Sequence, residues 1–215
     1  EVPGGMLAWG IPEYRLPRRI LEKEIAHLQR YGFEIKLNQP VGKSGLSIKD
    51  LKDQGYSAIF LAMGAQKSVP LVIEGANIEG VVDGLSWLKA VNLGTPAFAA
   101  ERVAVIGGGS VAIDAARSAL RRGAEAVTVI YRRSREDMPA IAEEILEAEK
   151  EGVEIICRAM PKRFLTEDGK VTGGACMKTE AGALDRSGRP QRVNLPGSEF
   201  TLPVDMVLVA IGQQP

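Results

Sequence analysis

Val103–Leu120 reads VAVIGGGSVAIDAARSAL and is the most informative part of the chain. Gly107, Gly109 and Ala112 make the pattern G-x-G-x-x-A, which between a strand and a helix is typical of a dinucleotide-binding turn. The first glycine permits the tight turn, the second lets the backbone approach a pyrophosphate, and the small third residue lets helix and strand pack closely. Because the first N–H groups of the helix then face the phosphates, the stretch predicts a Rossmann-like unit. The alternative is a tight turn without a ligand.

The segments on either side alternate between strand and helix. We expect strands at 102–106, 126–131 and 153–157, and helices at 109–122 and 140–151. Two consecutive strand–helix units predict an α/β fold with a parallel sheet. Toward the C-terminus we expect a hairpin over 164–180 around Asp168-Gly169, a polar surface loop over 181–194 and a last buried strand over 204–210.

The first 98 residues read as a second, smaller and incomplete α/β unit. We expect a helix at 18–31, a strand at 33–37, a short helix capped by Ser47, a buried strand at 58–62 and a helix at 85–93. Residues 94–101 read as a linker. The sequence therefore divides into residues 1–98 and residues 99–215, each with its own sheet.

Basic residues follow the second strand of the expected nucleotide unit. An NAD site places an acidic residue there to bind the ribose 2′-hydroxyl. Here Tyr131 is followed by Arg132 and Arg133, with Arg135 close by. The planar fork of arginine suits a phosphate group, so the sequence predicts NADP rather than NAD. The alternative is a solvated basic turn.

Charge and composition argue against several other classes of protein. Lys+Arg and Asp+Glu number 27 each, so no net field attracts nucleic acid or anionic lipid. No stretch approaches the ~18 apolar residues of a membrane span. His27 is the single histidine, and Cys157 and Cys176 have no CxxC spacing, so we expect no histidine metal site, no Ser-His-Asp triad and no catalytic residue. Two free thiols fit a reducing cytoplasm.

Five stretches together resemble one known family. They are GGMLAWGIPEYRLP (4–17), AIFLAMGA (58–65), VIGGGSVAIDAARSALRRGA (105–124), YRRSREDMPA (131–140) and LPGSEFTLPVDMVLVAIGQQP (195–215). They are similar to the small (β) subunit family of glutamate synthase. Its wider relatives include the flavin halves of dihydropyrimidine dehydrogenase and of an electron-bifurcating NADH-dependent ferredoxin:NADP oxidoreductase.

The resemblance implies an NADP domain inserted in an FAD domain, and electrons that pass between NADPH, FAD and iron–sulfur clusters. Residues 1–98 would be part of the FAD-binding-type domain and 99–215 the NADP-binding domain. Carried over by position, Gly108, Gly109, Ser110 and Val111 would meet the NADP pyrophosphate and Arg132 and Arg133 the 2′-phosphate, while Ala210, Ile211 and Gly212 match a strand end near both cofactors. The glycine turn and the basic segment add Gly107 and Arg135 to the candidate cofactor-binding residues. The implied flavin nucleotide contacts are Gly4, Gly5, Met6, Arg15 and Val41.

Three family features are missing from this sequence: the cysteine-rich cluster region, the first G-x-G-x-x-G, which cradles FAD, and the C-terminal Gly-Asp segment that holds the FAD after the last strand. We therefore expect NADP binding by this chain, FAD in the full-length protein, and iron–sulfur clusters elsewhere in that protein or in a partner. The partner would be a glutamate synthase large subunit or an iron–sulfur electron-transfer protein. By itself the fragment should be inactive and colourless. The alternatives are a thioredoxin-reductase-like flavoenzyme, which needs a CxxC, and a non-catalytic NADP-sensing module.

Overall fold

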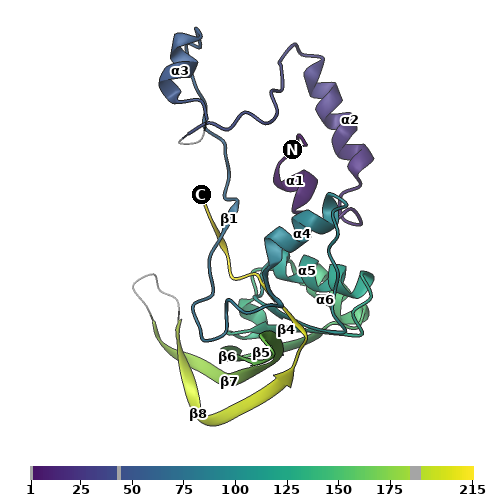
Figure 1. Cartoon of the computed structure of the whole chain (residues 1–215), viewed down its shortest axis with the longest axis vertical. Coiled ribbons are helices and arrows are strands. Elements are labelled where there is room, and N and C mark those ends of the chain that lie inside the picture. The colour runs from purple at the N-terminus through teal and green to yellow at the C-terminus, as the bar shows by residue number, and fades with distance from the viewer. Residues whose placement is uncertain (1, 43–44, 185–189) are drawn as a thin grey trace.

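The computed structural model describes residues 2–42, 45–184 and 190–215, and a five-stranded parallel sheet lies at its centre (Figure 1). The strand order is β2-β9-β3-β4-β5, and every neighbouring pair is parallel. The strands are β2 (Val81–Asp83), β3 (Arg102–Ile106), β4 (Ala126–Tyr131), β5 (Glu154–Cys157) and β9 (Met206–Val209). The predicted α/β fold with a parallel sheet is confirmed.

The two faces of this sheet carry different layers. Helices α4 (Gly84–Asn92), α5 (Ser110–Arg121) and α6 (Ala142–Lys150) pack on the face to which Val105 and Val129 point. The opposite face, with Ile106 and Ile130, is covered by an antiparallel sheet. Its strands are β6 (Ala159–Glu167), β7 (Lys170–Leu184) and β8 (Pro190–Pro203). Alternate residues of each parallel strand therefore enter two separate hydrophobic cores.

The remaining elements lie mostly near the N-terminus, and all of them except the 12-residue helix α2 are short. They are α1 (Met6–Trp9), α2 (Arg18–Gln29), α3 (Ile48–Asp53), the 3₁₀ helix η1 (Arg135–Asp137), and the strands β1 (Lys67–Ser68) and β10 (Gln213–Gln214), which pair with each other. Ser47 caps α3 as expected, because its hydroxyl accepts a hydrogen bond from the Asp50 N–H. Figure 1 shows α3 far from both sheets, at the end of extended chain.

Several predicted elements of the C-terminal half are confirmed. The strands at 102–106 and 126–131 have the expected bounds. The hairpin turns at Asp168-Gly169, where both residues have positive φ angles of 49° and 79°. The predicted loop at 181–194 is wrong for its described residues, because β7 continues to Leu184 and β8 begins at Pro190. Residues 185–189 lie outside the described part of the chain.

The strands predicted at 33–37 and 58–62 are wrong. Both segments are extended but pair with no strand among the described residues. The apolar residues that suggested burial are exposed: Phe60 is 92% exposed and Leu61 55% exposed. A strand needs a neighbour to accept and donate its ladder of hydrogen bonds, and the described chain offers none here.

The predicted boundary at residue 98/99 also differs from the structure. Strand β2 lies before it, yet Val81–Asp83 pair with Val207–Val209 in the central sheet. Helix α4 likewise packs against α5 in the same core. One sheet thus takes strands from both sides of the predicted boundary. A three-residue strand is too short to show the alternation that would reveal it in the sequence.

Candidate functional site

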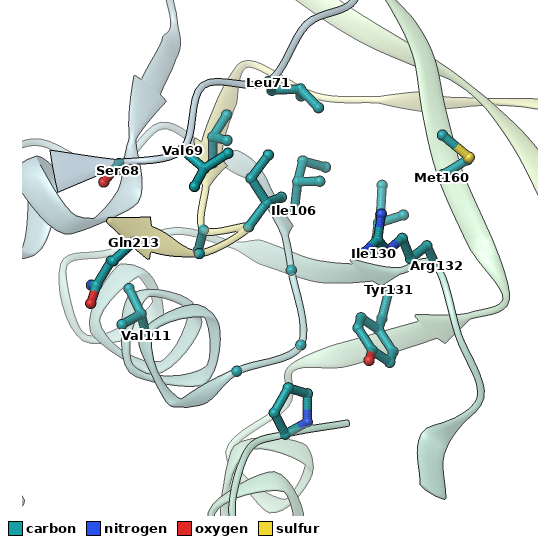
Figure 2. A pocket seen from close by; sticks show the side chains of 18 of the residues that line it. Ser68, Val69, Leu71, Ile106, Val111, Ile130, Tyr131, Arg132, Met160 and Gln213 are labelled. Carbon is teal, nitrogen blue, oxygen red and sulfur yellow. The ribbon is translucent and has the colours of Figure 1, made fainter. Parts of the chain in front are cut away.

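A cavity of about 620 Å³ opens at the carboxyl ends of β3, β4 and β9 (Figure 2). In open α/β sheets this edge is where ligands bind. The structure brings most of the sequence-predicted NADP contacts to its wall. They are Gly107, Gly108, Gly109, Ser110, Val111, Arg132, Arg133, Ala210, Ile211 and Gly212.

Gly107 makes the turn out of β3. Its φ angle is 146°, which residues with a side chain rarely adopt. A Cβ atom there would lie 2.2 Å from the carbonyl oxygen of Ala210. The Gly107 N–H donates to the Ile130 carbonyl at 3.1 Å. The turn is therefore clamped between β4 and the end of β9, and only glycine fits.

Gly108 rests on the ring of Tyr131, since an added Cβ would lie 2.5 Å from its Cδ2 atom. The Tyr131 hydroxyl donates to the Asp137 carbonyl at 2.7 Å. The Ala140 N–H in turn donates to the Gly108 carbonyl at 3.1 Å. These hydrogen bonds connect the glycine loop to the segment 131–140. The predicted pyrophosphate-binding loop and the predicted 2′-phosphate-binding arginines are therefore held next to each other.

Gly109 faces open space. It precedes α5 with φ −90° and ψ 175°, and a Cβ there would meet no atom within 4 Å. The first N–H groups of a helix lack intrahelical acceptors, and the helix dipole favours an anion beside them. A loop with this open side and these donors fits a pyrophosphate group.

Arg132 and Arg133 stand at the end of β4 and line the cavity. Neither makes an ion pair with any residue that the structure describes. The Nε atom of Arg133 is buried without a hydrogen-bond partner. Arg135 differs, because its guanidinium group donates to Glu149 at 2.5 Å and lies outside the cavity. The structure therefore groups two of the three predicted arginines.

The implied flavin contacts lie elsewhere. Gly4, Gly5, Met6, Arg15 and Val41 are absent from the wall of the cavity. Arg15 forms ion pairs with Asp114 of α5, at 2.7 Å, and with Glu144 of α6. Arg15, which was predicted to contact a flavin nucleotide, thus links the N-terminal segment to helices α5 and α6.

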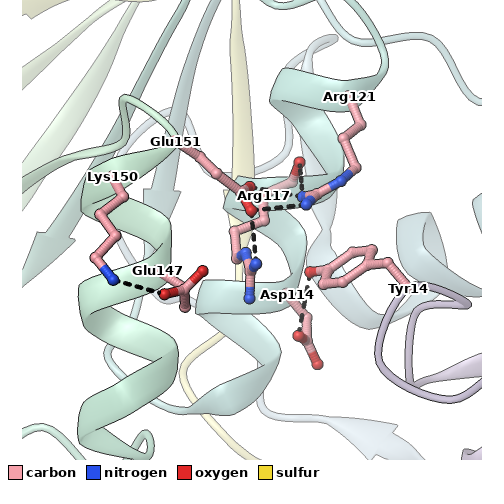
Figure 3. Close-up of polar contacts among 7 residues, drawn as sticks. All are labelled: Tyr14, Asp114, Arg117, Arg121, Glu147, Lys150 and Glu151. Carbon is pink, nitrogen blue, oxygen red and sulfur yellow. Dashed lines mark hydrogen bonds and ion pairs between the residues drawn. The ribbon is translucent and has the colours of Figure 1, made fainter.

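A polar cluster surrounds this junction (Figure 3). The ring of Tyr14 lies under two guanidinium groups, with the Cζ atoms of Arg117 and Arg121 at 4.8 and 4.0 Å from its centroid. The Tyr14 hydroxyl donates to Asp114 Oδ1 at 3.4 Å. Both arginines also pair with Glu151, and their hydrogen bonds lower the pKa of that carboxyl.

Asp114 is only 4% exposed, and burial raises the pKa of its carboxyl to about 6 even though Arg15 favours the charged form. The native state then binds a proton that the unfolded state, with a pKa of about 3.9, has already lost. The bound proton therefore increases the free energy of unfolding. This contribution is fully present below pH ~3.9, the unfolded pKa, and is lost as the pH rises through about 6, the folded pKa.

Replacing Asp114 with asparagine should remove this pH dependence. We expect the free energy of unfolding of the wild type relative to D114N to fall by about 2 kcal/mol between pH 4 and pH 7.5, since one pKa unit corresponds to about 1.4 kcal/mol. Urea unfolding at both pH values measures it, with Asp53→Asn on exposed α3 as control. A difference that stays constant with pH would contradict the assignment.

Sequence reasoning missed several residues of the site. Met160 and Pro161 reach the cavity from β6, and Val69 and Leu71 come from the chain after β1 (Figure 2). They belong to no motif, and their positions depend on long-range pairing. Within the described ranges, no group of three His, Cys, Asp or Glu side chains is placed to hold a metal ion. In the same ranges no helix combines the length and apolarity needed to cross a bilayer.

Two curated proteins are similar to this chain over nearly its whole length. The chain is 45% identical over 215 residues to the NADP(+)-dependent formate dehydrogenase subunit beta of Moorella thermoacetica, covering 99% of this chain and 30% of the relative. It is 36% identical over 222 residues to the glutamate synthase [NADPH] small chain of Halomonas elongata, covering 99% and 46%. The chain thus spans about a third to a half of the length of these curated relatives.

Solved structures show the same fold. FprA from Mycobacterium tuberculosis, solved in complex with NADPH, superposes with a TM-score of 0.80 at 17% identity, covering 99% of this chain and 62% of FprA. Thioredoxin reductase from T. acidophilum gives a TM-score of 0.56 at 18% identity, covering 100% and 67%. The family model described as pyridine nucleotide-disulphide oxidoreductase matches residues 14–215. The chain belongs to the pyridine nucleotide-disulphide oxidoreductase family.

Proposed function

We propose that this chain binds NADP(H) in the cavity at the carboxyl edge of the central sheet. The observation that carries the proposal is the meeting of an open glycine loop with two arginines that have no ion-pair partner among the described residues. Gly108–Val111 would hold the pyrophosphate through backbone N–H groups. Arg132 and Arg133 would hold the 2′-phosphate through charged hydrogen bonds.

We further propose that the chain is the NADP-binding part of a flavin-dependent oxidoreductase. When bound, NADPH would supply a hydride from nicotinamide C4 to flavin N5, and the reduced flavin would pass the two electrons one at a time to iron–sulfur clusters and release the proton to solvent. The strand end Ala210–Gly212 borders the cavity and would face the reacting end of the nucleotide. This chain's own part would be to bind and orient, since the described residues that line the cavity include no Asp, Glu, His, Cys or Lys.

Its partners are proposed from the relatives. These are named as subunits of formate dehydrogenase and of glutamate synthase. The chain would therefore work in the cytoplasm within a longer polypeptide, beside a glutamate synthase large subunit or another iron–sulfur electron-transfer protein. The flavin nucleotide would be contacted in that polypeptide by Gly4, Gly5, Met6, Arg15 and Val41.

Calorimetry with the two nicotinamide nucleotides tests the binding proposal. One charged hydrogen bond to the 2′-phosphate contributes about 1.5–3 kcal/mol, and 1.4 kcal/mol is a factor of ten. NADPH should therefore bind at least about tenfold more tightly than NADH. Equal affinities would show that the basic turn is solvated and does not select NADP.

Hydride transfer separates an oxidoreductase from a non-catalytic NADP sensor. The full-length protein, supplied with FAD, should reduce an artificial electron acceptor with NADPH. Binding of NADPH without any reduction of FAD or the acceptor would favour the sensing module instead.

A further inference from the structure

A second, smaller cavity of about 150 Å³ adjoins the first. Arg132 and Arg133 line both cavities, so the arginine pair lies between them. The other lining residues are Ser134, Asp137, Arg158, Thr179, Glu180 and Ala181. Since a water takes about 30 Å³ in the liquid, the space admits a few waters or one phosphate group.

Arg158, an exposed residue, is a third arginine in the wall of this cavity. It lies between β5 and β6, at the carboxyl end of a parallel strand and thus at the same edge as Arg132 and Arg133. Its φ angle is 54°, an uncommon conformation for a residue with a side chain. The Arg158 N–H donates to the Arg133 carbonyl at 2.7 Å, which holds the backbone there.

Thr179 of β7 forms hydrogen bonds with the backbone of both Arg158 and Arg132. Its N–H donates to the Arg158 carbonyl at 2.8 Å, and its hydroxyl donates to the Arg132 carbonyl at 2.8 Å. The residue is 2% exposed, so both bonds are shielded from water. One buried threonine of the antiparallel sheet therefore fixes the backbone of two arginines from separate segments.

The charges around this cavity favour an anion. Three arginines line this cavity together with two acidic residues, Asp137 and Glu180, and Glu136, which is not part of its wall, interacts electrostatically with Arg158. The Asp137 carboxylate already accepts a hydrogen bond from the Ser134 hydroxyl at 2.8 Å. None of the three arginines forms an ion pair with a residue in the described part of the chain. The Nε atom of Arg133 is buried and has no hydrogen-bond partner among the described residues.

We propose that this smaller cavity receives the 2′-phosphate of NADP(H), with Arg158 as a third binding cation and Thr179 as a positioning residue. The inference rests on the proposed function and extends it. Selection of NADP over NAD would then depend on the antiparallel sheet as well as on the strand–helix units that carry the glycine loop.

The first test replaces Arg158 with glutamine, which keeps most of the side-chain length and removes the charge. NADPH should bind about tenfold more weakly by calorimetry, because a charged hydrogen bond is lost, while NADH binding should stay unchanged. Lys162→Ala is the matched control, since it removes one positive charge from exposed β6 outside both cavities. It should change neither affinity by more than about twofold.

The outcomes separate the inference from the function beneath it. If the wild type prefers NADPH and R158Q keeps the full preference, Arg158 is no phosphate ligand and the inference fails alone. If the wild type shows no preference, the proposed NADP site fails too. An equal loss in R158Q and K162A would reveal only a general charge effect and would also overturn the role of Arg158.

Thr179 needs a measurement that separates positioning from stability. Thr179→Val removes the hydroxyl bond to Arg132 and should reduce the ratio of NADPH to NADH affinity several-fold, and Thr179→Ser should restore it. A purely structural residue would lower the melting temperature in T179V and leave the affinity ratio unchanged. That result would overturn the positioning role.

Discussion

A protein in which both Arg132 and Arg133 are replaced by alanine should bind NADPH about a hundredfold more weakly than the wild type. Each arginine would lose a charged hydrogen bond to the 2′-phosphate, which contributes about 1.5–3 kcal/mol. Two such losses amount to about 3 kcal/mol or more, and 1.4 kcal/mol is a factor of ten. NADH lacks the 2′-phosphate, so its affinity should change less than about threefold. Titration calorimetry with both nucleotides measures the two effects.

Arg135→Ala is the matched control for this double variant. It removes one positive charge from the same turn, against two in the double variant, but the Arg135 side chain is held by Glu149 and lies outside both cavities. Its effect on NADPH affinity should stay below about threefold, as for an exposed ion pair. If R135A weakened NADPH binding as much as the double variant does, the result would show general attraction by the basic turn and would contradict specific contacts from Arg132 and Arg133.

The central sheet could be predicted because its signals are local. The apolar residues 103–106 are followed by Gly107, whose positive φ forms the turn, and a second apolar run at 126–131 forms the next strand. Arg132 and Arg133 could be placed near that turn because parallel strands bring their carboxyl ends to one edge. Arg158 follows the parallel strand β5 in the same way, so its position near Arg132 and Arg133 could have been predicted from the sequence.

Other features depend on contacts that no local pattern reveals. The apolar segment 58–62 looks like a buried strand, but its burial needs a neighbouring strand that the described residues do not supply. Strand β2 is the opposite case, a strand that the sequence does not reveal. Its three residues show no clear alternation, and they form a strand because they pair with β9. The ion pair between Arg15 and Asp114 could not be predicted from the sequence either, because the two residues lie 99 positions apart.

The glycine loop allows fold and binding to be separated by two similar substitutions. Gly107→Ala places a methyl group 2.2 Å from the Ala210 carbonyl oxygen, at a φ angle of 146°. Backbone strain costs about 1–3 kcal/mol and overpacking about as much again. We therefore expect G107A to lose about 3 kcal/mol or more of unfolding free energy, measured by urea denaturation.

Gly109→Ala should do the opposite. Its φ of −90° suits alanine, and the added methyl group meets no protein atom within 4 Å, so stability should change by less than about 1 kcal/mol. The same methyl group would stand where the pyrophosphate approaches, so NADPH and NADH should both bind at least about tenfold more weakly. Equal loss for both nucleotides distinguishes this defect from that of the arginine variants, because both nucleotides carry the pyrophosphate. Unchanged affinity in a stable G109A protein would mean that the phosphates do not pass over this loop.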